Sequence, residues 1–187
     1  FAALRRPRPP SLAEIEAALA PDEALLSFLI SSRGGRSAIH GDWGGGSWLL
    51  VHTRGATRVQ ALPDSRDLEA AVSLFVGLLA RRDGSEAVAA ARLHQELLAV
   101  ALDQLPPRIT RLVLVPDGVL HRLPFEALRA DRSAAPLAMR YRVSIVPSVA
   151  LWLRLRREQA PRPPAPALVL GGSMNAAKPA KISDFSS

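Results

Sequence analysis

The stretch LVLVPDGVLHRLPFEAL, residues 112–128, decides how this chain is expected to fold. Leu112–Val115 is too short for a helix and apolar on both faces, which is typical of a central parallel strand. Pro116 and Gly118 suit the second and fourth positions of a type I turn after that strand. Catalytic side chains collect at such strand ends. If the stretch belongs to an active site, a nucleophile or a base is therefore expected nearby.

Composition indicates one soluble globular domain. The chain has 187 residues, of which 48% are hydrophobic and 22% charged, as in ordinary folded domains. It has no apolar run of the roughly 20 residues that span a bilayer and no signal-peptide pattern, so we expect a cytoplasmic protein without membrane contact. It contains no Cys, which excludes a disulfide, a thiolate ligand and a cysteine nucleophile. Phe1 stands where Met would begin a gene product, which indicates a fragment of a longer chain.

The net charge of +7 raises the question of nucleic-acid binding. The basic residues are scattered among the start of the chain, the end of a predicted helix and a Pro-rich stretch. No aromatic stacking platform is interleaved with them, although single-strand binders need one. A solvated basic surface is the favoured interpretation. Binding of a polyanion or a partner-docking face are the alternatives, and nucleic acid is not expected as a partner.

Residue usage changes abruptly near the end of the sequence. All 22 Arg lie at or before Arg162, while both Lys and the only Asn fall in the last 13 residues. We therefore expect residues 173–187 to be a foreign or disordered tail. Residues 1–10 are expected to be a linker from a longer parent chain, and residues 11–172 the domain itself.

The first half of the domain predicts a helix, an antiparallel sheet and two further helices. Ser11 and Glu14 form a capping box for a helix that ends near Ala20. Extended segments follow at 24–31, 38–40, 48–54 and 57–62, and the last two are predicted to form a hairpin around Gly55. A helical face repeats from Asp67 to Arg82, with Gly84 as its C-terminal cap. Ser85 is predicted to cap one further helix that ends at Pro106.

The second half predicts strands alternating with a helix. After the central strand come a strand at 141–146, a helix at 149–157, a stiff Pro-rich linker at 160–166 and a short strand at 167–170. The fold class is therefore α/β, preceded by an antiparallel hairpin portion.

The four histidines do not complete an active site in sequence. His40 and Asp42 form half of a metal site without a third ligand nearby, so a histidine at a loop edge is favoured. His52 is predicted to face outward or to be hydrogen-bonded, and His94 to lie at the boundary of the core. His121 follows the turn that holds Asp117, but neither has a Ser or Cys partner in sequence.

The remaining candidate groups are equally incomplete. Neither Ser47 nor Ser148 has an oriented base beside it in sequence. The glycines of residues 41–48 lack the spacing of a phosphate-binding loop, and GGSMN at 171–175 is not a nucleophile elbow. The residues alone predict an α/β domain with no complete active site, no metal and no cofactor.

The same stretch, LVLVPDGVLHRLPFEAL, resembles the central signature of CHAT domains, the caspase-like modules associated with tetratricopeptide repeats. The similarity covers residues 11 to 172 in the family's order. It includes SLAEIEAALAPDEALLSF, SWLLVHTRGATRVQALP, LHQELLAVAL, YRVSIVPSVALWL and PALVLGG.

This resemblance implies a caspase–separase-type layered sheet with flanking helices and, in the intact family, cysteine peptidase activity. A His deprotonates a Cys there, and backbone N–H groups hold the oxyanion. The His-Gly and Cys motifs lie beyond the strand that matches ALVLGG, and no residue of this chain matches either one. The implied role here is that of a scaffold, and the residues of the structural signature are Pro116, Asp117, Gly118, Leu120, Pro124 and Phe125.

The implied partners are the remainder of the chain's own CHAT domain and tetratricopeptide repeats of the parent chain. The alternative is a non-enzymatic CHAT-like module for protein interaction.

Overall fold

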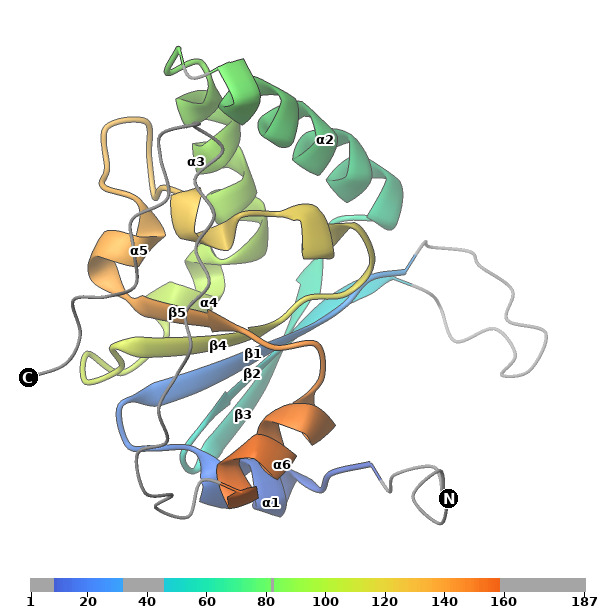
Figure 1. Ribbon diagram of the computed structural model, residues 1–187, viewed down its shortest axis with the longest axis vertical. Helices are drawn as coiled ribbons and strands as arrows, with labels where there is room; N and C mark the ends of the chain where they lie inside the picture. Colours follow the sequence, from blue (N-terminus) through green and yellow to red (C-terminus); the bar gives the residue numbers. More distant parts are fainter. Residues whose placement is uncertain (1–8, 32–45, 82, 159–187) are drawn as a thin grey trace, which may run out of the picture.

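A five-stranded mixed sheet forms the centre of the molecule (Figure 1). The computed structural model describes residues 9–31, 46–81 and 83–158. In the strand order β3-β2-β1-β4-β5, the first three strands are antiparallel, and β4 and β5 run parallel to β1. The strands are β1 (Glu23–Leu29), β2 (Ser47–Thr53), β3 (Ala56–Leu62), β4 (Arg111–Val115) and β5 (Arg142–Ile145). The α/β class and the antiparallel hairpin portion are thus confirmed.

The central position predicted for residues 112–115 is confirmed, because β4 lies between β1 and β5. Alternate residues of β4 point to opposite faces of the sheet. Leu112 and Leu114 belong to one apolar core, and Val113 and Val115 to the other. These two faces are called upper and lower below, as they lie in Figure 1.

The upper face carries the larger core, under four helices (Figure 1). They are α2 (Ser65–Arg81), α3 (Glu86–Leu97), α4 (Ala99–Asp103) and α5 (Leu137–Arg140). The predicted periodicity of α2 is confirmed, since Leu68, Val72 and Phe75 are fully buried.

The lower face is covered by two helices, α1 (Leu12–Ala18) and α6 (Val149–Glu158) (Figure 1). Ile15 and Trp152 are among the residues that pack against the sheet there. The predicted capping box of α1 is confirmed: the Ser11 N–H donates to the Glu14 carboxylate at 2.8 Å, and the Glu14 N–H donates to Ser11 Oγ at 3.3 Å. The Ser11 N–H and then Arg157, which reaches across from α6, lower the pKa of Glu14 to about 2.

The single helix predicted from Ser85 to Pro106 is wrong, because two helices meet at Leu98. Leu98 leaves helical geometry, with φ −126° and ψ −30°. Leu97, at the end of α3, and Leu98, at the break, are both fully buried. The apolar positions predicted for one helix are thus shared between α3 and α4.

The cap predicted at Ser85 is also wrong. Ser85 already has helical dihedral angles and makes no capping bond through its side chain. The Asp83 carboxylate instead accepts the Ser85 N–H at 3.0 Å. Gly84 has the positive φ, +80°, that its predicted place at a helix end requires.

The chain passes from β4 to β5 through a longer crossover than the turn predicted from the sequence. Two 3₁₀ turns, η2 (Gly118–Arg122) and η3 (Phe125–Ala127), precede α5. Between them and α5, Arg129 and Pro136 form an isolated antiparallel bridge. Parallel strands need such a crossover of a dozen or more residues.

Several predicted features lie outside the described residues: the extended segment at 38–40, most of the linker of residues 1–10, the linker at 160–166, the strand at 167–170 and the tail at 173–187. Within the described part of the chain, no helix is long and apolar enough to cross a membrane.

Candidate functional site

The signature segment, residues 116–125, begins with a carboxylate that binds backbone. Asp117 Oδ2 accepts the N–H of Ile30, just beyond β1, at 2.8 Å, and Oδ1 accepts the N–H of Gly118 at 2.9 Å. Asp117 thereby caps η2 and joins the end of β4 to the end of β1. The predicted type I turn is wrong, because φ −135° and ψ 152° place Asp117 in extended geometry.

Gly118 is required by its backbone conformation. Its φ is +53°, in the left-handed region that other L-residues adopt only with strain. Space is not the reason, since an added Cβ would lie 3.6 Å from the Ile30 Cβ, an ordinary contact. Pro116 and Leu120 on either side are buried.

The segment ends in a buried aromatic side chain. Pro124 precedes η3 and leads into Phe125, which is fully buried. The Phe125 and Phe28 rings have centroids 5.4 Å apart and planes tilted by 37°, a favourable aromatic arrangement. The signature segment is therefore fixed to β1 at two points, through Asp117 and through Phe125.

His121 is exposed on η2. Among the described residues, no hydrogen bond or ion pair joins it to Asp117, whose two oxygens already accept backbone N–H groups. The structure thus does not assemble these two residues into a base and its orienting carboxylate.

The side chains of the two candidate serines form hydrogen bonds with backbone groups. Ser47 is buried, accepts the N–H of Ser31 at 3.1 Å and donates to the Ser31 carbonyl at 3.0 Å. Ser148 Oγ accepts the N–H of Leu151 at 3.2 Å, at the start of α6. Neither hydroxyl has a histidine or carboxylate partner among the hydrogen bonds of the described residues.

The histidines of β2 and α3 lie inside the protein. His52 is hydrogen-bonded as predicted, with Nδ1 2.9 Å from Thr57 Oγ1. The boundary position predicted for His94 is wrong: it is buried, and its Nδ1 has no hydrogen-bond partner in the described structure. His40 and Asp42 lie outside the described residues, among which no cluster of three metal-ligating side chains occurs.

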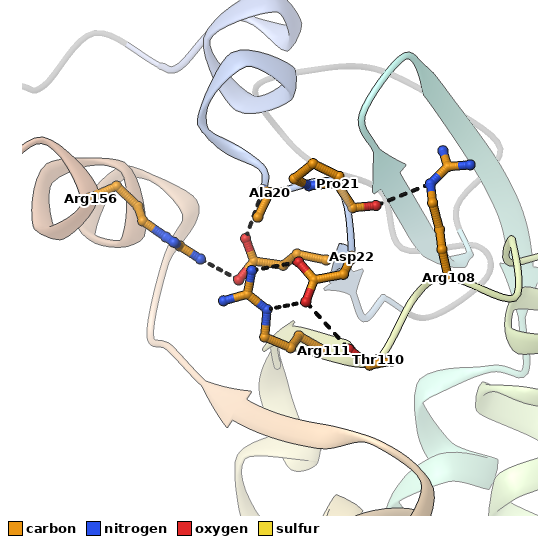
Figure 2. A network of polar contacts seen from close by, with 8 residues as sticks. Ala20, Pro21, Asp22, Arg108, Thr110, Arg111 and Arg156 are labelled. Atoms are coloured by element: carbon orange, nitrogen blue, oxygen red, sulfur yellow. Dashed lines mark hydrogen bonds and ion pairs between the residues drawn. The ribbon is translucent and has the colours of Figure 1, made fainter.

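A network of polar contacts at the start of β1 was not found from the sequence (Figure 2). Asp22 and Arg111 form a bidentate pair, with Oδ1–Nη2 at 2.7 Å and Oδ2–Nε at 3.0 Å. This pairing lowers the pKa of Asp22. The Asp22 carbonyl also accepts the N–H groups of Thr110 and Arg111. The network joins the starts of the two central parallel strands.

Glu23, the next residue, has a buried carboxylate. The residue is 3% exposed, and its carboxylate pairs with Arg156 of α6 while accepting the N–H of Ala20 at 3.3 Å. The guanidinium of Arg156 lies over the Trp152 ring, 5.4 Å from its centroid. In the sequence, the one available sign was an acidic residue at the edge of an apolar strand, and nothing there pointed to residue 156.

Residues 87–186 match the family model of the CHAT domain. The match covers more than half of the chain, so the chain belongs to the CHAT domain family. It begins within α3, contains the signature segment and α6, and continues beyond the described residues. The tail proposed for residues 173–187 stays a prediction, although the match runs through most of it. No curated protein matched the chain.

The Glu23–Arg156 pair leads to a prediction about stability. Arg156→Met leaves a buried carboxylate without its cation and should lower the free energy of unfolding by about 3 kcal/mol. Glu23→Leu combined with Arg156→Met removes both charges and should recover most of that loss. Arg157→Met breaks the exposed pair with Glu14 and should have a much smaller effect, because solvent screens it. Urea titrations of the four proteins measure this, and equal losses for Arg156→Met and Arg157→Met would contradict it.

The buried histidines lead to a prediction about pH. Burial lowers the pKa values of His94 and His52, although the charges of Asp103 and Glu16 respectively oppose the shift. Below about pH 6.5 the unfolded chain binds protons that the folded state excludes, so the free energy of unfolding falls as the pH decreases. Each histidine contributes at most about 1.4 kcal/mol per pH unit.

Urea titrations between pH 7.5 and 5 measure this slope, and His94→Gln should make it shallower. Carboxylates with lowered pKa values, such as Glu14 and Asp22, lose their stabilising charge only at more acidic pH. Stability that does not change over this range would show that both histidines accept protons freely in the folded state.

Proposed function

We propose that this chain is the N-terminal, non-catalytic part of a CHAT-type cysteine peptidase, in which it serves as scaffold and docking surface. Membership of the CHAT domain family supports the link to this peptidase class. The observation that supports this proposal most is that the candidate catalytic side chains either hydrogen-bond to the backbone or lie exposed. Asp117, Ser47 and Ser148 bond to backbone N–H groups, and His121 is exposed on the surface.

The signature segment has the properties of a scaffold element. It holds the carboxyl ends of β1 and β4 at a fixed spacing through one carboxylate and one buried ring. Catalytic groups of α/β proteins are placed at such strand ends. On this proposal, the His and Cys are supplied by the parent chain, and the described sheet supports them.

A non-enzymatic interaction module is the second candidate, and an exposed apolar surface favours it. Leu29 and Trp48 are cross-strand partners, as are Leu50 and Val59, on the lower face of the hairpin. Leu29, Trp48 and Val59 are 54%, 40% and 61% exposed, which is typical of a protein-binding patch. A parent sequence that lacks a His-Gly and a Cys after Gly172 would support this second candidate.

The proposed scaffold function predicts that this chain alone has no peptidase activity. A nucleophile held by an oriented base is needed for hydrolysis, and thiol-directed inhibitors have no thiol to label. The parent, extended through its His and Cys, should show both properties. A peptide-cleavage assay of the two proteins, each with and without His121→Ala, measures this. Turnover by the chain that disappears with His121→Ala would overturn the proposal.

A further inference from the structure

Helix α6 carries apolar side chains beyond those that pack in the lower core. Trp152 and Leu153 are 4% exposed and pack in the lower core. Leu151 and Leu155 are 38% and 46% exposed, and residues four apart lie on the same side of a helix. The apolar stripe of α6 is therefore wider than the part of it that the lower core covers.

A groove of about 320 Å³ lies beside Leu155, between α6 and the lower face of β5. Its lining includes Leu155, Trp152, Val146, Ser144 and Val113. Arg142 and Ser144 of β5 are exposed on this face, although parallel strands are normally covered on both faces.

Three of the four charged side chains beside the groove have partners, while the exposed Arg142 guanidinium makes no ion pair among the described residues. Glu23 and Arg156 pair with each other, and Arg111 pairs with Asp22. The apolar lining residues Val113, Val146, Trp152 and Leu155 offer an apolar segment a surface to bury.

The chain itself provides such a segment. Residues 167–170 read ALVL, and the match to the CHAT domain covers both them and α6. Eight residues, 159–166, separate this segment from the end of α6, and four of them are Pro. At about 3.1 Å per residue such a connector spans about 25 Å. The ten residues of α6 span about 15 Å, so ALVL can return along the whole helix.

The free edge of β5 is not the expected place for this segment. The crossovers from β1 to β4 and from β4 to β5 pass over the upper face, while α6 lies on the lower face. Parallel crossovers are right-handed in about 98% of cases. A right-handed connection through α6 therefore leads back toward β4 and away from the free edge of β5.

We propose that residues 167–170 dock in the groove between α6 and β5, cover Leu155 and begin a second layer of the domain. This inference rests on the proposed scaffold function and names the surface on which the scaffold receives the rest of its own domain.

Disulfide trapping in the full chain tests the proposal, because the chain has no Cys to interfere. Leu155→Cys combined with Leu168→Cys should form an intramolecular disulfide under mild oxidation. Leu155→Cys is then paired with Val169→Cys and with Leu170→Cys in place of Leu168→Cys. The rate of disulfide formation should alternate along the segment if it is docked in extended geometry. Non-reducing gel mobility and intact mass measure the rate.

The matched control is Arg154→Cys combined with Leu168→Cys. Arg154 is separated from Leu168 by almost the same length of chain as Leu155 is, but it lines a different groove, toward α1. Its disulfide with residue 168 should therefore form at least tenfold more slowly. Equal rates would show a segment that is not docked and would overturn the proposal. Predominantly intermolecular disulfides would assign the groove to a second copy and would overturn it equally. Because no step involves catalysis, an inactive parent would refute the scaffold function without affecting this result.

Discussion

Asp117 joins the carboxyl ends of the two central parallel strands, and the shape of the signature segment depends on it. Its carboxylate accepts backbone N–H groups from Ile30 and Gly118. A partly buried N–H group left without a partner costs about 1–3 kcal/mol, so the carboxylate is a structural requirement at this position. Once it is placed, Gly118 makes the left-handed turn and Phe125 reaches Phe28. These contacts explain why an acid, a glycine and an aromatic residue follow the strand in the sequence.

Features that depend on neighbouring residues could be predicted from the sequence. The capping box of α1, the hairpin around Gly55 and the apolar face of α2 follow from spacings of two to four residues. The central place of β4 followed from four apolar residues in a row, because only a strand covered on both faces needs them. The sequence also shows no nucleophile beside His121, and in the described structure no hydrogen bond or ion pair joins His121 to Asp117.

Features that depend on residues far apart in the chain could not be predicted. Glu23 and Arg156 are 133 positions apart, and Asp117 and Ile30 are 87 apart; no local pattern indicates either contact. The break at Leu98 could not be predicted either, because the apolar positions from Leu93 to Leu102 keep helical spacing through it. The position of His94 beside Leu93 and Leu97 in the sequence indicated the core boundary, whereas the packing of α3 buries it.

The central claim is that the acid of the signature segment is structural, and comparing stability with activity in Asp117→Ala tests it most directly. In this chain Asp117→Ala should lower the free energy of unfolding by about 1.5–3 kcal/mol, while His121→Ala, on the exposed side of η2, should change it by less than about 0.5 kcal/mol. In the parent, Asp117→Ala should lower peptidase activity only in proportion to the fraction of protein that is unfolded. Unchanged stability together with abolished cleavage would contradict the account and make Asp117 a catalytic residue.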